Sequence, residues 1–261
     1  MLETKRKRGW YWKVHGQEYQ RASIKNIKRF IGWNFLLDLI EECNNTLYRL
    51  DQVELLRQRD KGLIAALFLT GGRIKEVVQL RKANFDFETG KHLGVVVVKG
   101  MKLVKRFEKI GEWMEFTEVL PTNVMKRLYK WDEKEHMYYR RRWRTEPLDV
   151  ARDDFPIWLD DRLFPFFKEW FDSVEDYLFP AGKIRKKSKL PHLSTVRCYQ
   201  IVRGLGGRLG THLYDHWFRA QRASQLVKER KYNAEKLLRF FGWEKYETGL
   251  KYARLGWEDL V

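Results

Sequence analysis

The apolar run Gly62–Leu69 (GLIAALFL) leads into a glycine pair, Gly71–Gly72, and an arginine, Arg73, follows the glycines directly. A run of this kind predicts a helix buried in a hydrophobic core, and the glycines predict where that helix ends. Removing a guanidinium from water at the edge of a core costs free energy unless an anion accepts its charge. The stretch therefore predicts a core helix that stops beside Arg73, and this side chain requires a negatively charged partner.

The chain is strongly basic, with a formal net charge of +17 and an isoelectric point near 9.8 over 261 residues. Such an excess favours a polyanionic partner, and nucleic acid is the first candidate, with an anionic membrane surface as its competitor. No run of about 18 apolar residues occurs, so the sequence predicts no membrane span. An apolar fraction of 44% is enough for one large domain, or for one domain with a smaller one.

The two cysteines, Cys43 and Cys198, are too few for a disulfide scaffold or a metal site. The N-terminal segment (MLETKRKRGW) is basic but lacks the apolar core of a secretory signal. We therefore expect a reduced, cytoplasmic protein with no resident metal or cofactor.

Apolar residues recur at helical spacing through much of the chain, which predicts an α+β fold that is mostly helical. Between residues 92 and 110 a β-branched run instead predicts a hairpin, with Lys99 and Lys102 at or near its turn. The stretch 144–190 is rich in prolines and aromatics and predicts short helices and loops. Helices are predicted at 23–43, beginning at Ser23; as two segments within 51–72; at 73–84; after Pro121 toward 143; at 193–210, from Ser194 or Thr195 to the glycines; at 214–230; at 233–241, ending at Gly242; and at 244–255.

Four stretches, in order and in local pattern, resemble the tyrosine recombinase (phage integrase) family. They are TGGRIKEVVQL (70–80), VVVVKGMK (95–102), HWFRAQRASQL (216–226) and FFGWEKYETGLKYARL (240–255). They resemble, in turn, that family's T-G-x-R-x-x-E-x-x-x-L box, its β-hairpin lysine, its H-x-x-R box and its closing G-[H/W]…T-x-x-x-Y box. The matching residues are Thr70, Gly71, Arg73, Glu76 and Leu80; Lys99; His216 and Arg219; and Gly242, Trp243, Thr248 and Tyr252.

The resemblance covers roughly residues 51–255 and is weak between 129 and 190. It implies a tyrosine-recombinase catalytic domain at 49–261, mostly helical with a small antiparallel sheet. The family usually carries a separate helical DNA-clamping domain before the catalytic one. Residues 1–48, a basic arm and a helix, would then be a reduced or truncated clamp, present as a short N-terminal helical extension.

The resemblance also implies a site that breaks and rejoins DNA strands through a covalent 3′-phosphotyrosine, without a metal. Tyr252 would be the nucleophile, because a phenolate is also a fair leaving group for the return reaction. Arg73 and Arg219 would clamp the non-bridging phosphate oxygens with their planar forks of donors. The double-stranded DNA would thus supply the anion that Arg73 requires.

Three further residues complete the implied catalytic set. Lys99 would protonate the departing 5′-oxygen, with Lys102 and Lys105 as rivals for this role. His216 would hydrogen-bond the phosphate or take the proton of the nucleophile. Trp243 would donate its indole N–H and pack the floor of the site.

Plain structural alternatives stand beside these roles. Arg73 could form an ion pair with Glu76, and Lys99 could be a solvated turn residue. The histidine and the tryptophan could be core residues. Tyr246 lies close to Tyr252 along the chain and is a second candidate nucleophile.

The remaining positive charge would hold the DNA. Helical spacing puts Arg197, Gln200 and Arg203 on one face of the 193–210 helix. In the family resembled, the helix before the H-x-x-R box enters the major groove, so these residues are candidates for base contacts, against a solvated basic face. Lys102 and Lys105 would contact DNA from the hairpin. The basic segments 5–13 and 182–189 suit phosphate contacts.

Three functions remain open from the sequence. The first is a site-specific recombinase or integrase that acts as a homo-tetramer on two duplexes and is a monomer or weak oligomer when free. The second is a DNA-binding protein of the same fold without cleavage, since Ala220 follows Arg219 where the family usually has a histidine. The third is a type IB topoisomerase-like enzyme, which relaxes DNA by the same covalent chemistry.

Overall fold

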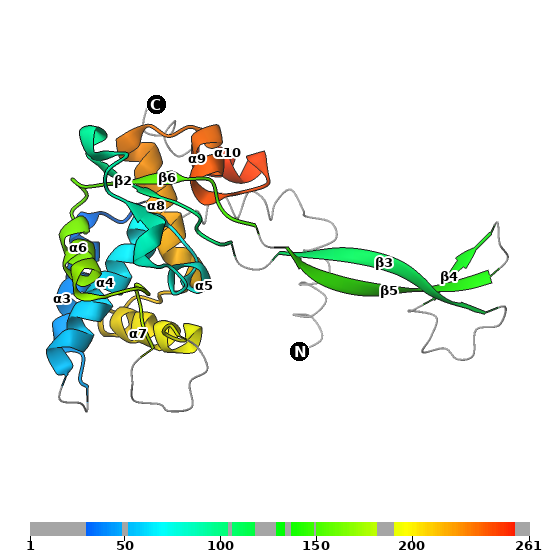
Figure 1. Ribbon diagram of the computed structural model, residues 1–261, viewed down its shortest axis with the longest axis horizontal. Helices are drawn as coiled ribbons and strands as arrows, with labels where there is room; N and C mark the ends of the chain where they lie inside the picture. The colour runs from blue at the N-terminus through cyan, green and yellow to red at the C-terminus, as the bar shows by residue number, and fades with distance from the viewer. Residues whose placement is uncertain are drawn as a thin grey trace, which may run out of the picture. The chain divides into compact units, whose positions relative to one another are not determined.

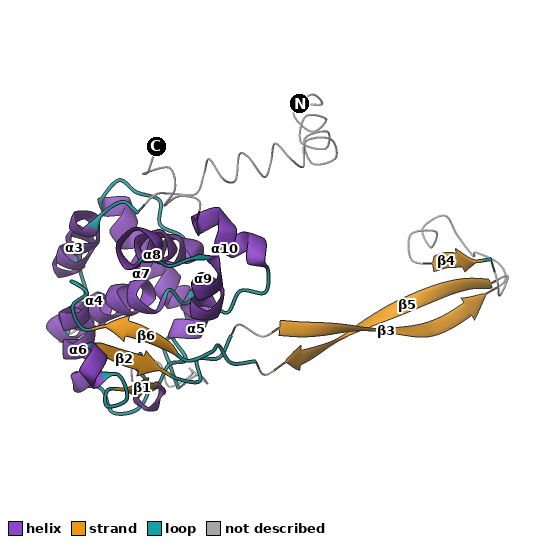
Figure 2. Ribbon diagram, turned by 90° about the horizontal axis from the view of Figure 1, so that it is seen from above, coloured by secondary structure: helices purple, strands orange, loops and turns teal. Residues whose placement is uncertain are grey.

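The computed structural model describes residues 30–48, 52–103, 106–117, 129–133, 137–148, 150–181 and 191–253, and the strands between 106 and 148 are described by their backbone. Helices predominate and pack around one long helix, α4 (Figures 1 and 2). The predicted α+β, mostly helical fold class is confirmed. The helices are α3 (Trp33–Glu42), α4 (Val53–Thr70), α5 (Ile74–Val77), α6 (Phe164–Ser173), α7 (Thr195–Arg208), α8 (Asp215–Arg230), α9 (Ala234–Phe241) and α10 (Tyr246–Ala253), with 3₁₀ turns at Cys43–Asn45, Lys82–Asn84 and Lys91–Leu93.

Helix α4 is continuous, whereas the sequence predicted two helices in this stretch. Its residues from Leu63 to Leu69 are fully buried, because α3, α6 and α8 all pack against it. Gly62 does not interrupt the helix. A Cβ built there would lie 2.5 Å from Cβ of Trp170, so the glycine allows α6 to pack directly against α4.

Several helices end at the predicted residues. Gly71 closes α4 and Gly242 closes α9, both in the left-handed region, with φ of 56° and 60°. Ser194 and Asn233 begin α7 and α9, and each side chain accepts a backbone N–H from the first turn. The predicted ends of α4 and α9 and the predicted starts of α7 and α9 therefore hold, although α7 continues through its glycines as far as Arg208.

The prediction of a helix over 73–84 is wrong beyond its first turn. Helix α5 ends at Val77, and the following chain pairs with a distant segment, with only a 3₁₀ turn at Lys82–Asn84. Leu80 O accepts the N–H of Leu178 at 2.8 Å, and Lys82 N–H donates to Asp176 O at 2.8 Å. The helix predicted at 23–43 is wrong at residues 30–32, which are not helical, because Gly32 has a φ of 110° and α3 begins only at Trp33. Ser23 lies outside the described residues.

A small antiparallel sheet lies beside α4, as Figure 2 shows. Its strands are β1 (Phe85–Asp86), β2 (Val95–Val98) and β6 (Phe155–Trp158), in the order β1–β2–β6. Val97 of β2 is paired with Pro156 of β6. A proline is tolerated there because β6 is an edge strand of this sheet.

The predicted hairpin at 92–110 is wrong, because β2 pairs with β1 and β6 and not with the residues that follow it. Between β2 and β6 the chain forms a separate compact unit, Lys102–Ala151. Its strands are β3 (Arg106–Thr117), β4 (Tyr129–Asp132) and β5 (Met137–Leu148), antiparallel in the order β3–β5–β4. The connection that the sequence suggested as a tight turn is therefore an inserted unit with its own sheet.

The helix predicted after Pro121 is also wrong where the structure describes that stretch. Residues 129–132 and 137–148 are the strands β4 and β5, and residues 118–128 lie outside the described ranges. Strand β5 (MYYRRRWRTEPL) contains two tyrosines and a tryptophan, which favour strands. Its long antiparallel pairing with β3 outweighs the helical spacing of its other residues.

Cys43 and Cys198 are buried free thiols. Within the described ranges, no group of three or more histidine, cysteine or acidic side chains is arranged to hold a metal ion. In the same part of the chain, no helix combines the length and the apolar character needed to cross a bilayer.

We predict that Gly62→Ala destabilises the fold, although alanine is the better helix former. The added methyl would overlap Trp170 at 2.5 Å, and overpacking of this kind costs about 1–3 kcal/mol. Gly204→Ala in α7 is the matched control, because a Cβ there meets nothing closer than Arg208 Nη1 at 3.8 Å. The control should gain up to about 1 kcal/mol from helix propensity. Urea unfolding of both variants measures the difference, and equal effects would contradict the packing argument.

Candidate active site

Arg73 and Arg219, far apart in the sequence, share the buried carboxylate of Glu76. Arg73 Nη1 lies 2.8 Å from Glu76 Oε1, and Arg219 Nη1 lies 3.7 Å from Glu76 Oε2. Glu76 is 1% exposed. Two guanidinium groups within reach of one carboxylate must lie close together, so the structure unites the predicted arginine pair. The alternative Arg73–Glu76 ion pair is present as part of the same cluster.

The spacing of the first sequence box explains how Arg73 and Glu76 meet. Arg73 is the N-cap of α5, with extended backbone, and Glu76 is the third helical residue. Glu76 Oε2 accepts the backbone N–H of Arg73 at 2.9 Å, as in a capping box. The Arg73 side chain remains 34% exposed, so its guanidinium can be reached from solvent.

Arg219 is buried, and backbone carbonyls fix its guanidinium. Nη1 donates to Gly71 O at 3.0 Å, and Nη2 donates to Phe241 O at 2.5 Å. Both carbonyls stand at the C-terminal ends of helices, α4 and α9, where backbone acceptors lack helical partners. Arg219 therefore joins the ends of two helices and faces Glu76 at their junction.

Three aromatic rings form a stack that connects Arg219 to Tyr252. The Phe241 and Trp243 centroids are 4.6 Å apart, and those of Trp243 and Tyr252 are 5.4 Å apart, with interplanar angles of 16° and 19°. The Arg219 guanidinium carbon lies 4.8 Å from the Phe241 centroid and 5.6 Å from the Trp243 centroid. The structure thus brings four of the six predicted residues into one cluster: Arg73, Arg219, Trp243 and Tyr252.

Burial raises the pKa of Tyr252 above its ordinary value, and the positive charge of Arg219 acts in the opposite direction. The hydroxyl is therefore protonated near neutral pH. Any reaction of this oxygen as a nucleophile has to include loss of its proton.

Lys99 follows β2 and is held by an acidic residue of the neighbouring strand. Its Nζ lies 2.6 Å from Asp86 Oδ2, and the Lys99 side chain is 45% exposed. The hydrogen bond to Asp86 raises the pKa of Lys99, and the same bond lowers the pKa of Asp86. In this structure Lys99 is engaged with Asp86 and not with the arginine cluster.

The remaining predicted catalytic and hairpin residues lie apart from these contacts. His216 is exposed in the first turn of α8, one turn before Arg219, so it is not a core histidine. Lys102 is exposed at the base of the inserted unit, where it pairs with Ala151. Lys105 lies outside the described residues.

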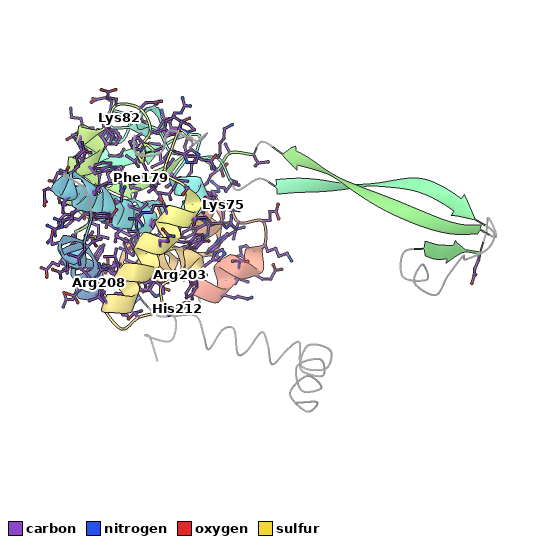
Figure 3. All side chains as sticks on the ribbon, turned by 90° about the horizontal axis from the view of Figure 1, so that it is seen from below. Lys75, Lys82, Phe179, Arg203, Arg208 and His212 are labelled. Atoms are coloured by element: carbon purple, nitrogen blue, oxygen red, sulfur yellow. The ribbon has the colours of Figure 1, made fainter. Side chains whose placement is uncertain are left out.

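The three residues predicted to face DNA are all exposed on α7: Arg197, Gln200 and Arg203. Arg197 Nη1 donates to Gln200 Oε1 at 3.2 Å, which confirms that they share a face of the helix. Figure 3 shows Arg203 on α7 with Lys75 of α5 on the same side of the molecule. Arg208, also labelled there, is engaged with Glu42 of α3.

Sequence reasoning missed one residue of the cluster, Arg152. Its Nη1 donates to Thr70 O at 3.0 Å, at the end of α4. The chain reaches this position only after the inserted unit, in a stretch where no motif was recognised. No signal in the local sequence (VARDDF) distinguishes it from a solvated loop arginine.

The sequence matches no protein-family model and no curated protein. Solved structures are similar in fold. XerH site-specific recombinase bound to difH substrate in a pre-cleavage complex has a TM-score of 0.50 at 16% identity, over 89% of this chain and 52% of that one. Its post-cleavage complex with palindromic difH has a TM-score of 0.53 at 15% identity, over 90% and 52%. XerA recombinase has a TM-score of 0.50 at 12% identity, over 90% and 63%.

This chain therefore spans about half to two thirds of the length of the structures that it matches. At such identities the likeness concerns the fold. It supports the predicted tyrosine-recombinase catalytic fold, on which the arginine cluster and the aromatic stack are built.

We predict that Glu76→Gln destabilises the protein by about 3 kcal/mol, because it leaves clustered guanidinium groups without their carboxylate. Glu235→Gln is the matched control, since Glu235 forms an exposed pair with Arg239 on α9, with side chains 63% and 73% exposed. That change should cost less than about 1 kcal/mol. Thermal unfolding of both variants measures the contrast. A Glu76→Gln protein as stable as the control would show that the carboxylate does not hold the cluster.

Proposed function

We propose that this chain is the catalytic part of a site-specific DNA recombinase that cuts and rejoins strands through a 3′-phosphotyrosine. The observation that carries the proposal is the shared Glu76 carboxylate, which joins Arg73 to Arg219, together with the ring stack from Arg219 to Tyr252. A phosphate diester needs cationic donors for its non-bridging oxygens and a nucleophile near them. The cluster offers both.

The two arginines would have different roles in phosphate binding. Arg219 is fixed by two carbonyls and by Glu76, so it would hold one phosphate oxygen in a set position. Arg73 is more exposed and would be the first to meet the incoming DNA. A clamp made of guanidinium groups needs no proton exchange, because arginine acts as a permanent cation in proteins.

In the cleavage step the Tyr252 oxygen would attack the phosphorus as its proton leaves, and the bond from phosphorus to the 5′-oxygen would break. His216 or water would accept the phenol proton, and Lys99 would donate a proton to the 5′-oxygen. The reverse step reseals the strand, because the phosphotyrosine retains the energy of the broken bond. Trp243 would support the Tyr252 ring and donate its indole N–H.

Lys99 would have to leave Asp86 before it could act as the acid. The hydrogen bond to Asp86 raises the pKa of Lys99, so Lys99 is protonated while this contact lasts and would carry its proton to the 5′-oxygen on release. Lys102 remains the rival on the same connection, because it is exposed.

The partner would be double-stranded DNA. The net charge of +17 would attract the phosphate backbone, and the exposed Arg197, Gln200 and Arg203 of α7 would enter the major groove. A homo-tetramer on two duplexes would complete the exchange of strands. XerH recombinase, which is similar in fold, is described bound to difH before cleavage and to palindromic difH after cleavage.

A second candidate, DNA binding without cleavage, is favoured by two observations. Tyr252 is packed against Trp243 with a raised pKa, and Lys99 is occupied by Asp86. In this case the arginine cluster would bind a backbone phosphate of the DNA without cleavage of the phosphodiester bond.

We predict that Tyr252→Phe abolishes a covalent protein–DNA adduct and leaves duplex binding unchanged, because only the reacting oxygen is removed. Nicked suicide duplexes from the DNA flanking the gene would trap the adduct, and peptide mapping would locate it. Tyr246→Phe is the matched control, since Tyr246 lies on the same helix and is 52% exposed. An adduct on Tyr246, or one that persists in Tyr252→Phe, would contradict the assignment. Wild-type binding without any adduct would support the second candidate.

We predict that Asp86→Asn moves the alkaline limb of the cleavage pH profile to lower pH. Asp86 raises the pKa of Lys99, so its loss lets Lys99 lose its proton at lower pH. Single-turnover cleavage from neutral to strongly alkaline pH measures the shift. Glu88→Gln is the control, because Glu88 in the same turn pairs with Lys91 at 3.8 Å. An unmoved limb would exclude Lys99 as the acid.

A further inference from the structure

Arg152 carries a buried guanidinium without an acidic partner among the described residues. The residue is 3% exposed, and Nη1 donates to Thr70 O at 3.0 Å. Nε and Nη2 have no hydrogen-bond acceptor in the described part of the chain. Unpaired buried donors are costly, and so is a buried charge without a counter-ion. A position that tolerates both costs calls for a physical explanation.

Aromatic rings contact the guanidinium directly, whereas Glu76 acts on it through its charge without forming an ion pair. The guanidinium carbon lies 3.6 Å from the centroid of Phe155 and 4.8 Å from that of Phe240. Such contacts stabilise a cation without supplying acceptors for its N–H groups. Burial, and then the charge of Arg219, lower the pKa of Arg152. The side chain is therefore held in place at a net electrostatic cost, and its one conventional bond is to Thr70.

Thr70 is the last residue of α4, and its carbonyl is one that the helix itself cannot satisfy. Arg152 binds this carbonyl, and Arg219 binds the next one, that of Gly71. Two arginines, distant from each other in the sequence, thus hold consecutive carbonyls that are separated from Arg73 by Gly72 alone. The path of the chain into Arg73 depends on both.

Arg152 is also the residue that follows the inserted unit directly along the chain. Its N–H donates to Met101 O at 2.9 Å, and these two residues flank Lys102–Ala151 on either side. Met101 touches the same loop, because a Cβ on Gly72 would lie 2.3 Å from Met101 Cε. Met101 and Arg152, the two residues that flank the insertion, are therefore packed against the Thr70–Arg73 loop.

We propose that Arg152 is a positioning residue, which holds the Thr70–Arg73 loop so that the Arg73 guanidinium stands where a scissile phosphate would bind. The effect on cleavage rests on the proposed function, whereas the effect on the loop does not. Arg152 would not contact DNA. It would act through the Thr70 carbonyl, supported by Met101.

Arg152→Met tests this, because methionine keeps an apolar stem among the rings and removes the donors. We expect unfolding temperature to be unchanged or higher, since an unpaired buried charge is lost. Amide hydrogen exchange of Gly71, Gly72 and Arg73 in the free protein should become faster by about 10-fold or more. Cleavage at saturating DNA should fall roughly 10- to 100-fold with unchanged duplex affinity. Arg152→Lys can still donate to Thr70, so it should restore part of the slow amide exchange and part of the cleavage rate.

Arg222→Met is the matched control. Arg222 is fully buried and has the same two nitrogens unpaired, but its Nη1 binds Asp161 at 2.8 Å and Gln225 at 2.9 Å. This variant should unfold at lower temperature yet keep the exchange rates of the loop below that temperature. Unchanged loop exchange in Arg152→Met would overturn the proposal. If wild-type protein forms no adduct, the proposed function fails, and loop exchange still decides the role of Arg152.

Discussion

The carboxylate of Glu76 is the interaction on which the candidate site depends. Arg73 and Arg219 both approach it, and its charge also opposes the mutual repulsion of these groups with Arg152. Cationic groups at close range in a low-dielectric interior would otherwise drive α4, α5 and α8 apart. With three guanidinium groups around one carboxylate, the cluster keeps an excess of positive charge. That excess is what a phosphate diester would neutralise on binding.

The same arginines take part in the fold. Arg152 and Arg219 bind the carbonyls of Thr70, Gly71 and Phe241, all at or next to helix C-termini. A helix C-terminus carries partial negative charge, so it stabilises a nearby guanidinium while the guanidinium satisfies its carbonyls. The same arginines therefore contribute both to the stability of the fold and to the candidate site. Substitutions there have to be assessed by unfolding and by reaction separately.

The inserted unit between β2 and β6 shows the limit of local patterns. A β-branched run beside Lys99–Gly100 suggested a hairpin, but β2 pairs with β6, which follows a separate compact unit along the chain. Which strand becomes a neighbour is decided by burial of both strands in the hydrophobic core, and no short stretch encodes that choice. The aromatic residues of β5 favoured a strand, and helical spacing alone led to the wrong prediction there.

The sequence by itself determined the ends of α4 and α9 and the spacing of the first box. Gly71 and Gly242 stop helices because they adopt positive φ at no steric cost, and Glu76 reaches Arg73 because both belong to one helical turn. Only the tertiary structure decided which distant residues join them. Arg219 and Tyr252 were found through a resemblance, and Arg152 was not found at all, because its neighbours are brought together by packing across the core. Contacts of that kind arise from the burial of whole elements, and a local stretch carries no record of them.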